Sequence, residues 1–129
     1  MTKYFSQTHE WALGPVVGIT DWAQKELGEI VYIDLPEVGS EVQAGDVLCV
    51  VETTKAATDI YAPFSGKIES VNEQLHEKPY LLNQDPENSG WIARVAFEKA
   101  GEYEKELKAL IDEPAYRELT QLSPKDAPN

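Results

Sequence analysis

The sequence predicts a mainly β domain that carries short helices near its C-terminal end. Short runs of β-branched and aromatic residues recur along the chain, separated by turn residues such as Gly and Pro. In the run 67–71, polar and apolar residues alternate with the period of a half-buried strand. The period changes after Glu102, where a helical stripe is formed by Tyr103, Leu107, Leu110 and Ile111.

Length and composition indicate one folded domain. The chain has 129 residues, of which 42% are hydrophobic and 26% are charged. Such a chain can bury a core without disulfides or metal ions. We expect a single domain over residues 1–122, with the C-terminal helices over about 101–122 and a disordered tail over 123–129.

Charge and cysteine content exclude several classes of protein. The net charge of −12 argues against binding to nucleic acid or to an anionic membrane surface, because both need clustered Lys and Arg. The single cysteine, Cys49, cannot form an internal disulfide or a cysteine-based metal site. No apolar run approaches transmembrane length and the start lacks a signal pattern, so we expect a cytoplasmic protein.

The first third of the chain predicts two short strands, a helix and a further strand. Their expected ranges are Thr8–Leu13, Val16–Ile19, Asp21–Leu27 and Glu29–Leu35. The helix has a start signal at its first residue and a stop signal after its last. Thr20 or Asp21 can accept an orphan helical N–H, and Gly28 suits the position just after the last turn.

A lysine lies at the bend of the next predicted hairpin. Its arms are Val47–Val51 and Asp59–Ala62, and Pro63 ends the second arm. Lys55 lies at or beside the tip, although no Asn-Gly or Asp-Gly pair specifies the turn type. An exposed lysine is usually only a solvated charge, so its surroundings must decide whether it has a function.

Beyond the strand over 67–71, the rest of the chain predicts one more strand and two helices. The strand covers Trp91–Phe97, and Pro79 opens a single helical turn before it. A helix is expected over Glu102–Ile111, with its apolar stripe covering a sheet. A second helix begins at Asp112 and Pro114 and carries Ala115, Tyr116 and Leu119.

An enzyme that uses His9, Glu10 or Asp59 as acid–base groups is a hypothesis of a different class. The sequence supplies no nucleophile accompanied by a base and an orienting group. The two histidines, His9 and His76, have no partners at metal-ligand spacing, so no metal site is expected. We therefore favour a role without catalysis.

The lysine hairpin resembles the hairpins of lipoyl- and biotinyl-carrier domains. Biotinyl carriers usually place Met on both sides of the lysine, whereas Thr54 and Ala56 flank Lys55 here, which favours lipoylation. From about Tyr4 to Leu119, the chain resembles the H-protein family of the glycine cleavage system. The motifs that carry this resemblance include His9-Glu10-Trp11, Val17-Gly18-Ile19-Thr20-Asp21, Leu27-Gly28-Glu29-Ile30-Val31, Glu52-x-x-Lys55-Ala56, Asp59-Ile60-Tyr61-Ala62-Pro63, Asp85-Pro86 and Gly90-Trp91.

This resemblance implies a flattened barrel-sandwich of two small sheets, and a carrier in place of a catalyst. Lipoic acid would form an amide with Lys55, with Glu52, Thr54 and Ala56 around the attachment site. The arm would shuttle the aminomethyl group from glycine decarboxylase to aminomethyltransferase and pass electrons to dihydrolipoyl dehydrogenase. A lipoate ligase or lipoyl transferase would load the arm. A monomer is expected for a carrier that visits several enzymes.

The resemblance also implies a surface groove that shields the loaded arm from water. Its residues in this chain would be Thr8 and Glu10 from the first strand and Asp59 just past the lysine. Carboxylates suit this task, because the amine of the load is cationic near neutral pH. The alternative is that Glu10 and Asp59 are only exposed strand charges.

Two features of the sequence depart from the family pattern. Trp22 stands where the family's Thr-Asp-His-Ala-Gln motif usually has His, and only Ala12 to Val16 separate the first two strand motifs. Neither departure touches the lysine hairpin. Both lie near the expected groove, so a second hypothesis remains: an H-like protein that relays lipoyl groups to other complexes or serves lipoate-dependent sulfur oxidation.

Overall fold

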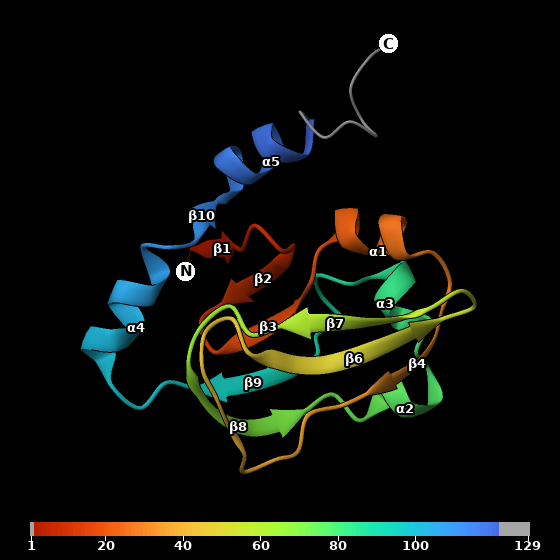
Figure 1. The fold of residues 1–129 in the computed structure, drawn as a ribbon, viewed down its shortest axis with the longest axis horizontal. Helices are drawn as coiled ribbons and strands as arrows, with labels where there is room; N and C mark the ends of the chain where they lie inside the picture. Colours follow the sequence, from red (N-terminus) through yellow and green to blue (C-terminus); the bar gives the residue numbers. More distant parts are fainter. Residues whose placement is uncertain (1, 122–129) are drawn as a thin grey trace.

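The computed structural model describes residues 2–121. They form two antiparallel sheets with five helices around them (Figure 1). The larger sheet has the strand order β10-β1-β2-β3-β9-β8-β5, and the smaller has the order β4-β6-β7. The larger sheet is built from β1 (Lys3–Phe5), β2 (Glu10–Leu13), β3 (Val16–Ile19), β5 (Glu41–Val42), β8 (Gly66–Val71), β9 (Ala93–Ala96) and β10 (Ile111–Asp112). The smaller sheet is built from β4 (Ile30–Asp34), β6 (Val47–Thr53) and β7 (Ala57–Tyr61).

One apolar core lies between the two sheets. The larger sheet contributes fully buried side chains such as Val17, Ile68 and Val95, and the smaller sheet contributes Ile33 and Val51. In β8 and β9 the buried residues alternate with more exposed ones, as expected for strands with one buried face, whereas β3 is buried over three consecutive residues. The predicted mainly β sandwich is confirmed, although seven short strands make the larger sheet wider than expected.

The N-terminal elements agree closely with their sequence signals. Strands β2 and β3 form the predicted first hairpin, with Leu13 opposite Val16 and Gly14 in the turn at a φ of 57°. Helix α1 (Asp21–Leu27) begins where predicted, because Thr20 Oγ1 accepts the Ala23 N–H at 3.1 Å. It ends at Gly28, whose φ of 82° favours glycine.

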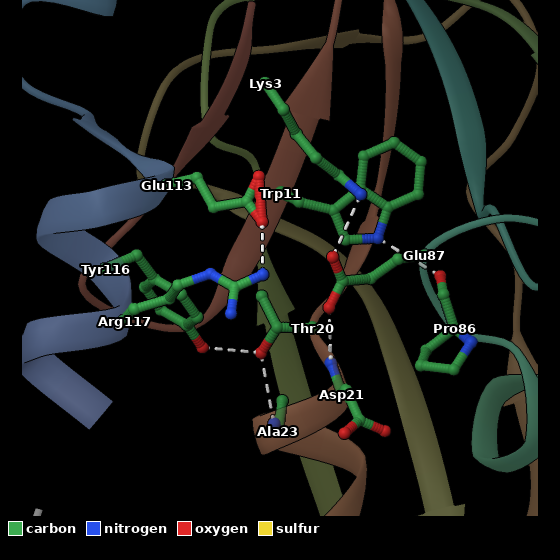
Figure 2. Close-up of polar contacts among 10 residues, drawn as sticks. All are labelled: Lys3, Trp11, Thr20, Asp21, Ala23, Pro86, Glu87, Glu113, Tyr116 and Arg117. Atoms are coloured by element: carbon green, nitrogen blue, oxygen red, sulfur yellow. Dashed lines mark hydrogen bonds and ion pairs between the residues drawn. The ribbon is translucent and has the colours of Figure 1, made fainter. Parts of the chain in front are cut away.

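Loops in the second half of the chain tie the N-terminal elements together. Trp11 Nε1 donates to the Pro86 carbonyl at 3.1 Å, and Glu87 accepts from Lys3 Nζ and from the Asp21 N–H, each at 2.9 Å (Figure 2). The Glu87 carboxylate thus occupies the N-terminal end of α1, where a negative charge is favourable. These contacts give a physical role to Pro86 of the Asp85-Pro86 motif and to Glu87, which follows it.

Asn83 links α1 to the smaller sheet. It belongs to α3 (Leu81–Gln84), the short helix that follows the predicted turn at Pro79 and comes after α2 (Gln74–Glu77). Its Oδ1 accepts the Ile30 N–H at 2.9 Å, and its Nδ2 donates to the Gly28 carbonyl at 2.7 Å. Asn83 therefore satisfies backbone groups at the junction between α1 and β4.

The C-terminal region corrects one expectation. The predicted helix over 102–111 is α4 (Ala100–Leu107), which ends four residues earlier. Ile111 and Asp112 form β10, which pairs with Phe5 and Tyr4 of β1. The apolar stripe that includes Leu110 and Ile111 favoured a longer helix. The backbone groups of Ile111 and Asp112 are satisfied instead by pairing with β1, which is distant in the sequence.

The remaining C-terminal helix begins where it was expected. Helix α5 (Glu113–Gln121) starts after Asp112, whose Oδ1 accepts the Ala115 N–H at 3.1 Å. The strand predicted over 91–97 is shorter, since β9 spans Ala93–Ala96. The disordered tail predicted for 123–129 lies outside the described residues. Within residues 2–121, none of the helices has both the length and the apolar character needed to cross a membrane.

Candidate functional site

Lys55 lies in the turn that joins β6 to β7, and Figure 1 shows this turn extending beyond the body of the molecule. Thr53 holds the turn from one side. Its N–H donates to the Ala56 carbonyl at 2.9 Å, and its Oγ1 accepts the N–H groups of Lys55 and Ala56 at 3.2 Å each. The turn is therefore fixed through its backbone without an Asn-Gly pair, and the lysine side chain takes no part in fixing it.

The surroundings of Lys55 leave its amine accessible. Lys55 is exposed, as are Glu52, Thr54 and Ala56. Among the described residues, none forms an ion pair or a hydrogen bond with the Lys55 ammonium group. Converting this amine into a neutral amide would therefore break no contact within the described part of the chain. The position fits a covalently attached carboxylic acid such as lipoic acid.

Glu10 has the opposite surroundings. It is only 2% exposed, and its carboxylate accepts hydrogen bonds from Ser6 Oγ at 2.7 Å, from Thr8 Oγ1, and from the Tyr61 N–H at 3.2 Å. Burial raises the pKa of Glu10, and these hydrogen bonds partly oppose that rise. Glu10 therefore joins the first hairpin to β7 as a buried acceptor, and the view of it as an exposed strand charge is wrong.

The three expected groove residues do not share one environment. Thr8 is exposed and contacts Glu10 directly, whereas Asp59 is exposed on β7, two residues before Tyr61. The structure thus brings Thr8 and Glu10 together, and it places Asp59 on the strand that Glu10 contacts.

His9 belongs to an aromatic cluster beside Glu10. Its ring stacks on Trp22 at 3.9 Å between centroids, and its φ of 72° is rare for a residue with a side chain. The Tyr116 hydroxyl lies 2.8 Å from His9 Nδ1 and 2.6 Å from Thr20 Oγ1 (Figure 2 shows the latter contact). Phe5 of β1 stacks on the same tyrosine at 4.5 Å, so Tyr116 fastens α5 to the larger sheet.

The protonation states in this cluster are consistent with its hydrogen bonds. Burial raises the pKa of Tyr116 to about 12 and lowers the pKa of His9, so a neutral phenol meets a neutral imidazole near pH 7. Thr20 Oγ1 already accepts the Ala23 N–H. Its own proton is then available to Tyr116, whose proton can go to His9 Nδ1. No group of three His, Cys, Asp or Glu side chains within residues 2–121 is arranged to hold a metal ion.

Sequence reasoning missed three residues that shape these two regions. Thr53 is not among the residues expected around Lys55, yet a Thr at the end of a strand is a known turn former and gives a usable signal. Ser6 and Tyr116 had no such signal. Their roles depend on contacts with Glu10 and His9, and the second of these pairs is separated by 107 residues.

Comparisons with known proteins agree with this geometry. The family model described as "Glycine cleavage H-protein" matches residues 3–123. The glycine cleavage system H protein of Thermotoga maritima is 48% identical over 121 residues, covering 91% of this chain and 94% of that protein. The probable glycine cleavage system H protein of Thermococcus gammatolerans is 51% identical over 118 residues, covering 88% and 85%.

A solved structure supports the same assignment in three dimensions. The crystal structure of a glycine cleavage system H protein from Mycobacterium marinum superposes with a TM-score of 0.77 at 32% sequence identity. The match covers 94% of this chain and 98% of the other. Sequence, fold and the exposed hairpin lysine thus lead to one conclusion: the chain belongs to the glycine cleavage H-protein family.

Proposed function

We propose that this protein is the lipoyl carrier of a glycine cleavage system and that Lys55 is its attachment site. Members of the family carry lipoic acid on a lysine and are not catalysts themselves. The observation that carries the assignment to Lys55 is its free, exposed amine at the tip of the β6–β7 hairpin. When bound, lipoic acid supplies the disulfide that accepts the one-carbon unit and the electrons.

The chain's own contribution is to position one amine. The turn is held by Thr53, and the two strands behind it belong to a sheet packed on the core. A group mounted on such strands keeps its direction better than one on a long loop. Thr54 and Ala56 are small, so an enzyme can approach the Lys55 amine from either side.

We also propose that Thr8, Glu10 and Asp59 contribute to the surface on which the arm rests. Support comes from the contact of Glu10 with both Thr8 and the backbone of β7. A carboxylate near that surface favours a cationic amine over a neutral one. The buried position of Glu10 suggests that it acts chiefly by holding Thr8 and β7 in place, while the exposed Asp59 meets the solvent.

The partners of the system are glycine decarboxylase, aminomethyltransferase, dihydrolipoyl dehydrogenase and an enzyme that attaches lipoate. We propose a cytoplasmic location, because the relatives that this chain matches are bacterial and archaeal H proteins. That the carrier is a monomer stays a prediction.

Reconstitution of glycine–bicarbonate exchange tests this proposal. The lipoylated protein is mixed with glycine decarboxylase of the same organism, and incorporation of labelled bicarbonate into glycine is measured. Exchange that depends on the lipoylated chain is the expected result, and Lys55→Arg should remove it. If fully lipoylated protein supports no exchange, the lipoyl-relay or sulfur-oxidation role becomes the better account.

A further inference from the structure

Strand β4 presents two adjacent apolar side chains to solvent. In a regular strand, neighbouring side chains point to opposite faces. Here the pairing with β6 shifts between Ile30 and Tyr32, which leaves Val31 as an extra residue in a β-bulge. Ile30 and Ile33 remain buried, whereas Val31 is 47% exposed and Tyr32 is 45% exposed. The bulge therefore creates an outward apolar pair that strand alternation alone would not produce.

This apolar pair lies beside the lysine hairpin. Tyr32 is paired with Glu52 and Ile30 with Thr53, the residue that holds the turn. Glu52 is exposed like Tyr32, while Val51 next to it is buried, so Tyr32 and Glu52 share the outer face of the smaller sheet. Lys55 follows Glu52 by only three positions along the chain.

The charge on this outer face has one sign. Strands β4, β6 and β7 contain the exposed acids Asp34, Glu52 and Asp59, and they contain no Lys, Arg or His. Asp34 and Asp59 are both paired with Val50, on its two sides. An apolar pair next to carboxylates is the complement of a basic surface with an apolar hollow.

We propose that the outer face formed by Val31, Tyr32, Asp34, Glu52 and Asp59 is the docking surface for the enzyme that acylates Lys55. Tyr32 and Val31 are its apolar anchor, and the carboxylates face basic side chains of that enzyme. This inference rests on the proposed lipoylation of Lys55 and adds the surface by which it is achieved.

Reach decides which partner uses this surface. Before modification, the amine extends from the backbone only by the four methylene groups of lysine. The acylating enzyme must therefore bring its active site against the hairpin, next to Tyr32 and Glu52. After modification, the remaining partners act on the far end of a long arm, which frees them from close contact with this face.

The test is the rate of lipoylation of Tyr32→Thr and Val31→Thr, measured with lipoate, ATP and lipoate–protein ligase by intact-mass spectrometry. Thr keeps the preference for a strand while removing most of the apolar surface. We expect kcat/KM for the protein substrate to fall about tenfold for Tyr32→Thr, mainly through KM, as for a central interface residue. The matched control is Val38→Thr, because Val38 is 56% exposed but lies outside the smaller sheet.

A second set of variants tests the role of charge. It compares Asp34→Asn with the control Glu104→Gln in α4. Asp34→Asn should slow acylation and weaken its dependence on salt, whereas Glu104→Gln should change neither. Both positions are exposed, so the folded structure is retained, and circular dichroism checks this for all variants.

The outcomes separate this inference from the function on which it rests. If the unaltered chain gains no lipoyl group on Lys55, the proposed function fails. If the unaltered chain is lipoylated and Tyr32→Thr reacts at the same rate, the docking surface is refuted. The lipoylated Tyr32→Thr protein should be reduced by dihydrolipoyl dehydrogenase and NADH as fast as the unaltered one. Slower reduction would overturn the assignment of this face to the acylating enzyme.

Discussion

The tip of the β6–β7 hairpin and the cluster around Glu10 are built on opposite principles. At the tip, Lys55 is exposed and its turn is held by the neighbouring residue Thr53. Around Glu10, two nearby hydroxyls hold a buried carboxylate, and the contacts of Glu10 with Tyr61 and of His9 with Tyr116 join segments that are far apart in the chain. The first region leaves a reactive group free, and the second fixes the scaffold that presents it. Substitutions at the tip should therefore change function and leave stability unchanged. Substitutions in the cluster should lower stability first.

The largest expected effect comes from Lys55→Arg. The guanidinium cannot form the lipoyl amide, so lipoylation and every activity that depends on it should be lost completely. The free energy of unfolding should change by less than about 0.5 kcal/mol, as for other surface substitutions. Intact mass and urea denaturation measure the two effects, and Lys67→Arg of β8 serves as the control that keeps both properties.

Glu10→Ala should have the largest effect on stability. It removes the acceptor of the Ser6 and Thr8 hydroxyls and of the Tyr61 N–H. Glu10 itself is only 2% exposed. Leaving the buried Ser6 hydroxyl and the partly buried Tyr61 N–H without this acceptor should cost about 2 kcal/mol in total, whereas the exposed Thr8 hydroxyl can bond to water. Urea denaturation monitored by tryptophan fluorescence measures this loss. Unchanged stability would mean that the cluster does not hold the scaffold.

The same carboxylate predicts a pH dependence. Because its pKa is raised in the folded state above the ordinary 4.5, the folded protein retains a proton that the unfolded chain has released. The contribution of Glu10 to stability is therefore greatest below about pH 4.5 and falls as the pH rises toward the folded-state pKa. The difference in unfolding free energy between the unaltered protein and Glu10→Gln should decrease over this window. An increase would reverse the assigned direction.

Tyr116→Phe should have an intermediate effect. It keeps the stack on Phe5 but removes the hydrogen bonds to Thr20 and His9. The expected loss is about 1 kcal/mol, typical of a neutral hydrogen bond. Relative to the unaltered protein, the variant should show a larger increase in amide hydrogen exchange in α5 than in α1. Equal protection of α5 in both proteins would show that Phe5 alone fastens this helix.

Trp22→His should have the smallest effect overall, because it should leave lipoylation unchanged and lower stability only slightly. It replaces the larger ring that stacks on His9 at 3.9 Å by the histidine that the family resemblance leads us to expect at this position. We expect a loss of about 0.5 kcal/mol, the lower end for an aromatic pair. Lipoylation should proceed at the original rate, since the substitution lies outside the hairpin. A change in that rate would connect the two regions more closely than their contacts suggest.

The two regions also differ in how far the sequence predicts them. The bounds of α1, the arms of the lysine hairpin and the exposure of Lys55 follow from caps, turns and strand propensities, which act over a few residues. Strand β10 and the burial of Glu10 do not follow from such signals, because each depends on a partner chosen by the complete fold. The bulge at Val31 was also missed, since its sequence, Ile-Val-Tyr-Ile, reads as a continuous apolar strand.

The central claim is that Lys55 is the amine on which this carrier is loaded. Its most direct test is intact-mass spectrometry with peptide mapping after the chain is incubated with lipoate, ATP and lipoate–protein ligase. The account predicts one added lipoyl group per chain, located on the peptide that contains Lys55. An unmodified chain, or a lipoyl group on any other lysine, would contradict it.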